Sequence, residues 1–278
     1  MVLMMVAMMA SLSSCRSLVL EDRSECPCFL FFNITNASEF NGAEKVYTCV
    51  YDVLKEKQAA RDTLLVKQMT PEGYYFKLRS NQEYEGFGIA GLHRCQVDRS
   101  QQFTVPVGED YDPIYRFGFE TEGFEESKVV PVEFTKEHVK LTIIFSNFDD
   151  YTGAEGQFPF QIALRSNTCG INGLTGLPVR GEYRFVPDEM MAGEFEMHLP
   201  RQADNSLMLE IWVKEGIKYF DEGLVDEFSL YELLNESGSI DWKEKNLPDV
   251  ELIIDYVEHS YRIKVSPWEQ SIDLSYNL

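Results

Sequence analysis

Basic residues are scarce in this sequence. Its 278 residues include 25 Lys and Arg against 46 Asp and Glu, which gives a formal net charge of −21 and a pI near 4.6. A surface of this sign repels the phosphates of nucleic acids and anionic lipid head groups. We therefore expect no nucleic-acid partner, and we expect any membrane attachment to come through a covalent lipid and not through a basic patch.

Catalytic motifs are also missing. The sequence contains no nucleophile elbow, phosphate-binding P-loop or HExxH zinc pair. Residues 86–91 (Gly-Phe-Gly-Ile-Ala-Gly) carry glycines at the first, third and sixth places of a dinucleotide-binding turn, but no helical pattern follows them. Glycines in a strand that passes close to another backbone are the favoured interpretation. His93 near Cys95 lacks a third, orienting group. The sequence therefore predicts a protein that is not an enzyme and binds no cofactor.

Cysteine pairs with metal-binding spacing are absent. Cys26 and Cys28 are separated by one residue, no second pair follows, and the four histidines are isolated from one another, so we expect no metal site. If Cys15 is set aside, the other five of the six cysteines cannot all pair with one another. We expect at most two structural disulfides, and Cys28 with Cys49 is one plausible pair among several.

The start of the sequence has no apolar run long enough to span a bilayer. Residues 2–12 are apolar, whereas a membrane helix needs roughly 20 such residues. A short apolar run at the N-terminus, followed by polar sequence, is typical of a signal peptide. We therefore predict a signal peptide over residues 1–14.

The residues that end this run resemble the bacterial lipobox, in which a signal peptidase cuts before a cysteine whose thiol carries diacylglycerol. They are Leu12, Ser13, Ser14 and Cys15. The small residues suit a narrow peptidase pocket, and the thiol is the group there that can accept the lipid. We predict that the peptidase recognises the first three and that Cys15 carries covalent diacylglycerol and palmitate. The alternative is that Cys15 is incidental, in an ordinary cleaved signal or behind a mistaken start codon.

Strand signals dominate the first half of the remaining chain. A Phe-rich run over 28–35 and an alternating pattern over 46–53 are bounded by turn residues. Residues 54–67 are the best helical candidate, because they contain no Gly or Pro. Further strands are expected at 74–78, 86–92, 102–107, 114–119, 129–134 and 139–146. Short strands at intervals of roughly ten residues predict an antiparallel sandwich.

A polar, Gly-rich segment at 149–156 is the predicted domain boundary. It divides the chain into an N-terminal domain (26–150), preceded by a tether (15–25), and a C-terminal domain (151–278). Strands are expected in the second domain at 158–165, 181–186, 194–199, 207–213, 250–257 and 261–265, with one or two helical turns over 226–235.

The last residues of the chain alternate in polarity. One face of the expected final strand carries Ile272, Leu274, Tyr276 and Leu278, and the other face is polar. Such a strand either packs within its own sheet or stays open for strand exchange with a neighbouring protein. An ordinary final strand is the alternative.

Together these features resemble the fimbrial anchor lipoproteins of Bacteroides-type bacteria, the FimB class of the fimbrillin (type V pilus) superfamily. The likeness rests on Cys15, on the sequence Asp-Arg-Ser-Glu-Cys-Pro-Cys at 22–28, on 86–92, on 134–146, and on 249–278 with Trp268 before the last strand. The resemblance implies an all-β fold of two transthyretin-like antiparallel β-sandwich domains in tandem, with short helical turns.

The resemblance also implies a function. The protein would be attached to the cell outer membrane by the lipid on Cys15, with its folded part exposed at the surface. It would hold a fimbrial stalk pilin by non-covalent strand complementation, and so limit the shedding and the length of the fimbria.

A tip adhesin is the competing hypothesis. In that case a surface lipoprotein would bind a glycan or a host protein, for example through exposed aromatic side chains of Tyr111, Tyr115 and Trp242. A lipid-anchored enzyme is a third class, disfavoured by the missing motifs.

Overall fold

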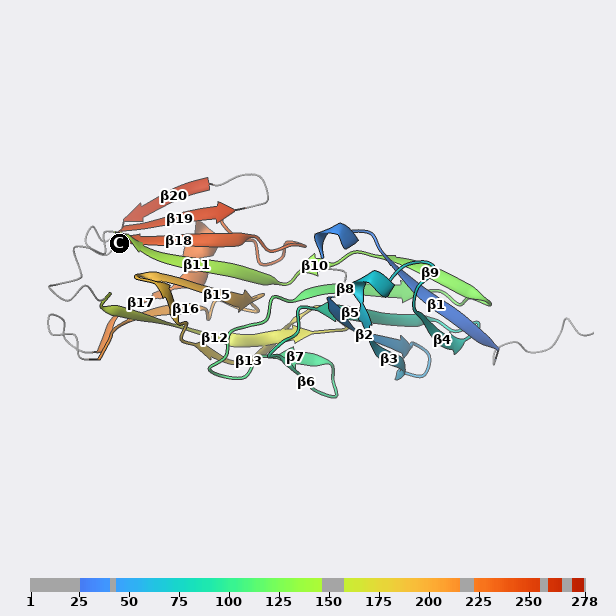
Figure 1. Cartoon of the computed structure of the whole chain (residues 1–278). Coiled ribbons are helices and arrows are strands. Elements are labelled where there is room, and N and C mark those ends of the chain that lie inside the picture. The colour runs from blue at the N-terminus through green and yellow to red at the C-terminus, as the bar shows by residue number, and fades with distance from the viewer. Residues whose placement is uncertain are drawn as a thin grey trace, which may run out of the picture.

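The computed structural model describes residues 26–40, 44–146, 158–215, 223–255, 260–266 and 272–277. The predicted signal peptide, the tether with Cys15, and Leu278 lie outside these ranges. The molecule is elongated and consists of two β-sandwiches placed end to end (Figure 1). The first strand begins at one end of the molecule, and the last described strand lies at the other.

The first sandwich consists of a three-stranded and a five-stranded sheet. In spatial order the smaller sheet contains β4 (Tyr75–Arg79), β1 (Pro27–Ile34) and β9 (Ser127–Val132). The larger sheet contains β10 (Thr135–Lys136), β8 (Tyr115–Thr121), β5 (Tyr84–Ala90), β2 (Lys45–Asp52) and β3 (Lys57–Leu65). Two short 3-10 helices, η3 (Ala37–Glu39) and η4 (Val66–Gln68), follow β1 and β3.

The core of the first sandwich follows from alternation along β1. Every second residue of this strand, beginning at Cys28, is buried, because successive side chains of a strand point to opposite faces of the sheet. Phe32 lies at the centre of this face and packs against the rings of Phe76, Phe117 and Phe119 at centroid distances of 4.8–5.9 Å. Aromatic pairs at these distances add to the stabilisation from buried apolar area.

The second sandwich is built from two six-stranded sheets. One contains β14 (Glu189–Met191), β15 (Glu194–Pro200), β11 (His138–Ser146), β18 (Asp249–Asp255), β19 (Ser260–Ser266) and β20 (Ile272–Asn277). The other contains β17 (Gly223–Ser229), β16 (Met208–Val213), β12 (Phe160–Asn172), β7 (Gln102–Thr104) and β6 (Gln96–Val97), and β13 (Pro178–Phe185) also pairs with β12.

A single α-helix is present in the described residues, α2 (Leu230–Glu236), where the sequence predicts helical turns. The hydroxyl of Ser229 caps it by accepting a hydrogen bond from the backbone N–H of Glu232 at 3.1 Å. Leu230 and Leu234, four residues apart, are buried in the hydrophobic core of the second sandwich, which we call the second core. The predicted all-β fold with short helical turns is confirmed.

The two sandwiches meet between β5 and β7. Phe87 on β5 and Phe103 on β7 are fully buried, and their rings lie 6.0 Å apart in an edge-to-face arrangement. Gly173, at the β12–β13 turn, is needed here, since a Cβ atom at that position would lie 2.5 Å from the ring of Phe87. Phe87 thus belongs to the second core although its strand is part of the first sandwich.

The domain boundary predicted at residues 150 and 151 lies outside the described residues, and strands from before and after it share sheets. β11, which precedes that point, pairs with β15 and β18 of the second sandwich. β7, which also precedes that point, pairs with β12 of the second sandwich. The second sandwich therefore contains strands from before residue 150, because strands pair with their neighbours in space whatever their position in the chain. Two pairs, β1–β9 and β11–β18, are parallel.

The prediction of a helix over residues 54–67 is wrong. Most of this segment is β3, which pairs along β2 from Asp52↔Lys57 to Lys45↔Leu65. β3 is an edge strand whose residues are mostly exposed, so its sequence shows neither an apolar face nor strand-like alternation. The pairing with β2 overrides its local preference.

Candidate functional site

The first candidate site is the free edge of β20. Among the described residues, this strand is the last of its sheet, and it pairs with β19 from Val265↔Ile272 to Ser260↔Asn277. The backbone therefore places Ile272, Leu274 and Tyr276 on an edge strand, as the sequence predicts, and Leu278 lies outside the described residues. Their exchange with a partner strand stays a prediction.

Two other sheet edges are protected against strand addition. The edge strand β3 carries the charged side chains of Lys57, Arg61 and Asp62. The edge strand β9 contains Pro131, which has no backbone N–H to donate. Charges and proline are the usual means by which sheet edges avoid pairing with another chain.

The part of β15 that does not pair with β14 is protected in a different way. The backbone N–H of His198 donates to the Asp110 carboxylate at 2.8 Å, and the Tyr183 hydroxyl donates to the His198 carbonyl at 3.1 Å. These side chains take the place of a neighbouring strand. An added peptide would have to displace both of them, which makes this edge a poor acceptor.

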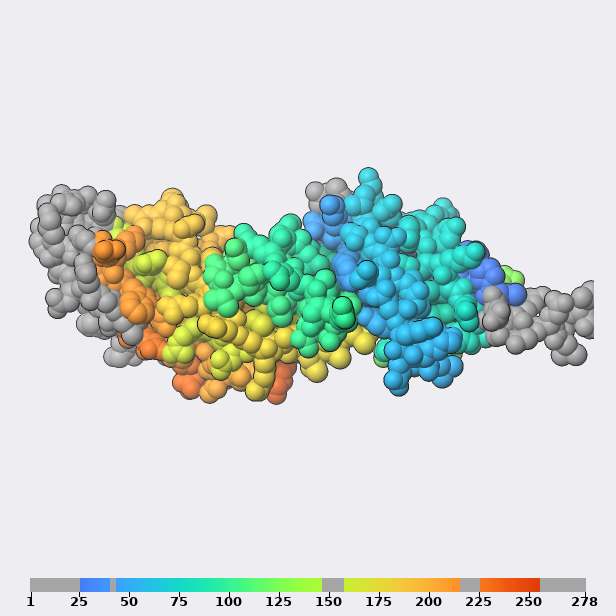
Figure 2. All heavy atoms as spheres, turned by 90° about the horizontal axis from the view of Figure 1, so that it is seen from below, coloured from blue at the N-terminus to red at the C-terminus, as the bar shows by residue number. Residues whose placement is uncertain are grey.

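The space-filling view shows the same elongated body with the N-terminal residues at one end (Figure 2). Cys26, the first described residue, is exposed, and its carbonyl accepts a hydrogen bond from Ser80 at 2.9 Å. β1 starts beside it at the end of the molecule opposite β20 (Figure 1). The entry of the chain and the open sheet edge thus lie far apart.

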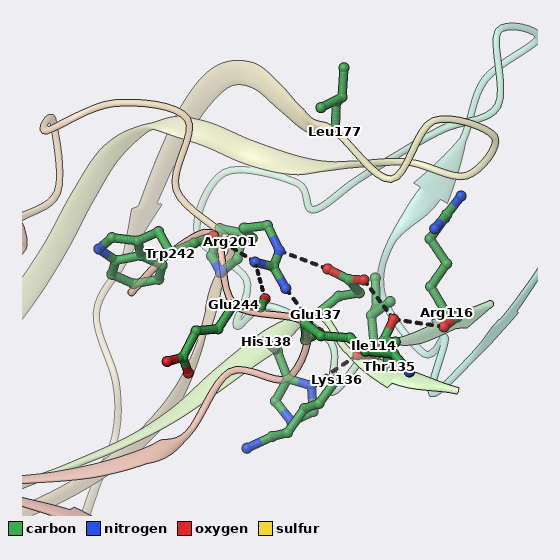
Figure 3. A network of polar contacts seen from close by, with 12 residues as sticks. Ile114, Arg116, Thr135, Lys136, Glu137, His138, Leu177, Arg201, Trp242 and Glu244 are labelled. Atoms are coloured by element: carbon green, nitrogen blue, oxygen red, sulfur yellow. Dashed lines mark hydrogen bonds and ion pairs between the residues drawn. The ribbon is translucent and has the colours of Figure 1, made fainter. Parts of the chain in front are cut away.

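The second candidate site is a crevice of about 640 Å³ at the junction of the two sandwiches. We call it the junction crevice; its walls come from β8, β10, the start of β13, and the loops at 201–203 and 242–245. Its charged lining residues are Arg116, Arg180, Arg201, Lys243, Lys245, Glu137 and Glu244. Figure 3 shows the network of polar contacts on one side of it.

Arg201 is the centre of this network. Its guanidinium donates to the Glu137 carboxylate at 2.8 Å, and to the carbonyls of Trp242 and Glu244 at 2.5 and 2.8 Å (Figure 3). The side chains of Arg201 and Glu137 are only 11% and 7% exposed. Glu137 also accepts a hydrogen bond from the Thr135 hydroxyl at 2.9 Å. The arginine thereby fixes the 242–245 loop against β10.

Arg116 links the two sandwiches. It stands on β8, and its Nε and Nη2 donate to the carbonyls of Gly173 and Leu174 at 2.7 and 2.6 Å. Burial lowers the pKa of Arg116, and the charge of Glu137 partly opposes this shift. Among the described residues no carboxylate forms an ion pair with Arg116, so its positive charge is held in place without being neutralised by a direct partner.

His138 lies beneath the crevice and is neutral at neutral pH. Burial lowers its pKa to about 3, and the nearby positive charge of Lys136 acts in the same direction. Its Nδ1 lies 3.0 Å from the carbonyl oxygen of Ile114, a contact that requires this nitrogen to carry the hydrogen. His138 therefore acts as a structural hydrogen-bond donor.

The aromatic residues proposed for an adhesin are not exposed. Tyr111 is 0% and Trp242 is 6% exposed, and both belong to the second hydrophobic core. Tyr115 is half-buried and packs edge-on against Phe40 and His138. This prediction is wrong, because an aromatic residue in a β-rich chain is more often part of a core than of a binding surface.

The predicted pair of Cys28 with Cys49 is also wrong. Both thiols are free and buried, and so is that of Cys169. Cys28 faces the first core, where its thiol donates to the carbonyl of Arg79 at 3.1 Å, whereas Cys49 faces the second core. Val50, next to Cys49, is the residue of β2 that faces Cys28's side, so the alternation of the strand keeps the two thiols apart.

The segment with His93 and Cys95 is a structural loop. Backbone N–H groups of three consecutive residues, 93–95, donate to the buried carboxylate of Asp112 at 2.8–3.0 Å. Burial and the charge of Asp112 raise the pKa of the Cys95 thiol, which disfavours the reactive thiolate.

The glycine-rich stretch at 86–91 is a strand, as predicted. It lies mostly within β5, and a Cβ atom on Gly86 would lie 2.1 Å from the Cys49 carbonyl oxygen of the neighbouring strand. Within the part of the chain that the structure describes, no three His, Cys, Asp or Glu side chains gather as metal ligands would. The described helices include none with the length and apolar character of a membrane span.

No family model matches the sequence, and no curated protein matches it. Solved structures do. The fimbrial anchor protein Mfa2 from Porphyromonas gingivalis is 11% identical and aligns with a TM-score of 0.62 over 90% of this chain and 100% of that chain.

Two proteins from Bacteroides thetaiotaomicron align with slightly lower TM-scores. A candidate polysaccharide-binding protein is 12% identical, with a TM-score of 0.58 over 89% of this chain and 98% of that chain. A candidate adhesin is 14% identical, with a TM-score of 0.57 over 91% of this chain and 99% of that chain. Identities this low establish the fold alone, and the chain therefore shares the all-β fold of these fimbrial and adhesin proteins, as the sequence resemblance predicts.

Proposed function

We propose that the protein is a lipid-anchored fimbrial component of the outer membrane, exposed at the cell surface, that holds a pilin. The observation that supports this proposal is that the first described residue and the edge strand β20 lie at opposite ends of an elongated body. The chain enters at Cys26, and the open edge of β20 lies at the other end (Figure 1). A molecule built in this way would present its free edge away from the membrane.

The membrane end of the proposal rests on the lipobox-like residues before Cys15. Between that cysteine and Cys26 lie ten residues, so the fully extended connection measures at most roughly 40 Å. A diacylated and palmitoylated cysteine anchors a protein stably, because each buried CH₂ group contributes about 0.8 kcal/mol. The folded part would then stay within one molecular length of the bilayer.

We propose that the pilin binds by strand complementation along the edge of β20. A strand added along an open edge gains a ladder of backbone hydrogen bonds, and alternate side chains supply specificity. Among the edges described above, β3 carries charged side chains and β9 contains Pro131. On the part of β15 that does not pair with β14, the backbone N–H of His198 already donates to Asp110. The sequence of β20 has one charged residue, Asp273, in six. This contrast favours β20 as the edge that pairs with a partner.

The comparisons support the proposal through the names of the similar proteins. One of them is a fimbrial anchor, and another is a candidate adhesin. A role as an anchor in the FimB class agrees with the lipobox, the tether and the position of β20. Such a role requires binding and no catalysis, so it needs neither a cofactor nor a metal.

Photo-crosslinking in intact cells tests where the pilin binds. A photoreactive residue at Ser275 on β20 is expected to crosslink to a pilin, whereas one at Leu54 is not. Leu54 is a suitable control because its side chain is 72% exposed at the turn between β2 and β3, in the first sandwich. Crosslinks to pilin from Leu54 and none from Ser275 would contradict the proposed orientation.

A further inference from the structure

The junction crevice gathers positive charge in an acidic protein. Five of its lining residues are basic (Arg116, Arg180, Arg201, Lys243 and Lys245), and two are acidic (Glu137 and Glu244). The whole chain has 25 basic against 46 acidic residues, so basic residues outnumber acidic ones in the crevice although they are the minority in the chain. The bases come from β8, from β13 and from two loops, which means that the fold and not a local run of sequence brings them together.

Two of the five basic side chains, those of Arg116 and Lys243, form no ion pair with any described residue, and the ion pair of Arg180 is long. Arg116 donates to two carbonyls, as described above. Arg180 is 76% exposed and lies 3.8 Å from Asp204, a distance at the limit of an ion pair. Within the described ranges, no acidic side chain forms an ion pair with Lys243. Arg201 and Lys245 are paired with Glu137 and Glu133, at 2.8 and 2.6 Å.

An apolar surface stands on the side of the crevice away from the Arg201 network. Leu177 is 64% exposed and projects from the turn before β13, apart from the polar contacts (Figure 3). Pro178 and Ala203 also line the crevice. A volume of about 640 Å³ lies within the range of roughly 300–1,000 Å³ that is usual for small-molecule sites. Apolar walls with a few convergent polar groups are the usual make-up of such sites.

We infer that the junction crevice binds an anionic saccharide, with its carboxylates facing Arg180 and Lys243 and its C–H face against Leu177. A guanidinium recognises a carboxylate through paired hydrogen bonds, and an ammonium contributes a point charge. This function is separate from the pilin edge of β20 and does not depend on it.

An acidic peptide is the competing ligand, and the geometry disfavours it. Extended peptides are usually bound by pairing with an open sheet edge. The sheet edge at the crevice is β10, which has only two residues. The backbone N–H of Lys136 on this strand already donates to the side chain of Asn246 at 2.8 Å. The charged side chains proposed for the ligand are Arg180, near the start of β13, and Lys243, in a loop. Two separate side chains of this kind suit a compact ring better than an extended chain.

Calorimetric titration of the purified protein at low salt tests this inference. The probe is a trisaccharide of galacturonic acid, compared with its fully methyl-esterified form and with a peptide of five glutamates. We expect saturable binding of the acid form, with binding of the ester weaker by at least about tenfold. The variant Arg180→Gln/Lys243→Gln is expected to weaken binding of the acid form by a similar factor. Higher salt is expected to weaken it as well.

The matched control is Lys67→Gln/Lys128→Gln, which removes the same charge from two exposed residues that do not line the crevice. It is expected to bind the saccharide like the native protein. Absence of binding, equal binding of acid and ester, or equal losses in both double variants would overturn the inference. Tighter binding of the peptide would also overturn it, and would assign the crevice to an acidic protein segment.

Discussion

Cells that produce the Cys15→Ala variant are expected to release their fimbriae into the medium. The variant would lose the acyl chains that hold the base of the fimbria, and non-covalent contacts with pilin alone would leave the assembly free to diffuse away. Pilin in the medium should rise by at least about tenfold relative to cell-bound pilin, since each lost CH₂ group removes about 0.8 kcal/mol of membrane binding. Immunoblots of cells and medium measure this ratio.

Cys26→Ala is the control for this experiment. Cys26 is an exposed, free cysteine that lies close to Cys15 in the sequence, so its replacement changes a thiol without removing the lipid site. The native chain should yield a mature N-terminal peptide that begins at an acylated Cys15 in mass spectrometry. A mature chain without lipid, together with unchanged fimbriae in Cys15→Ala cells, would refute the anchor and favour a secreted binding protein.

Arg201→Met is expected to lower the free energy of unfolding by about 3–5 kcal/mol. The substitution leaves the carboxylate of Glu137 buried without its charge partner, 7% exposed in the native protein. It also removes the donors for the carbonyls of Trp242 and Glu244. Urea unfolding followed by circular dichroism measures the change. Arg180→Met is the matched control, expected to cost at most about 1 kcal/mol because its ion pair is exposed and long.

The double variant Arg201→Met/Glu137→Leu separates the two causes. If the buried, unpaired charge dominates the loss, the double variant will be more stable than Arg201→Met alone. If the lost contacts to the loop dominate, the double variant will be no more stable than the single one. A cost below about 1 kcal/mol for Arg201→Met would contradict the structural role of this arginine.

Most strands were predictable because one of their faces is buried. The pattern of β18, in which Val250, Leu252 and Ile254 alternate with partly exposed residues, appears directly in the sequence. The same holds for β1. β3 was not predictable, since an exposed edge strand has no buried face to impose alternation. The pairing of β7 and β11 with strands that follow residue 150 was not predictable either, because local composition carries no information about which strands pair.

The junction crevice could not be found in the sequence. Its central ion pair joins Glu137 to Arg201, and Arg116 reaches the carbonyl of Gly173, so each contact links segments far apart in the chain. No motif marks such residues. The aromatic prediction failed for Tyr111 and Trp242 because residue type does not reveal which side of a strand or loop faces a core. The strand β20 was predictable, since alternation of polar and apolar residues over 272–277 is visible in the sequence, whereas its position at the edge of the sheet was not.

The central claim is that the open edge of β20 holds the pilin, and a pair of proline substitutions tests it most directly. Neighbouring residues of a strand direct their N–H groups to opposite sides, so one of Leu274→Pro and Ser275→Pro removes a donor from the open edge. The other removes a bond to β19. Two quantities are measured for each variant: the midpoint of its unfolding transition and the amount of pilin that co-purifies with it.

The account predicts that one variant keeps the native unfolding midpoint and yet binds at least about tenfold less pilin than the native protein does. Native amounts of pilin bound to both variants would contradict it.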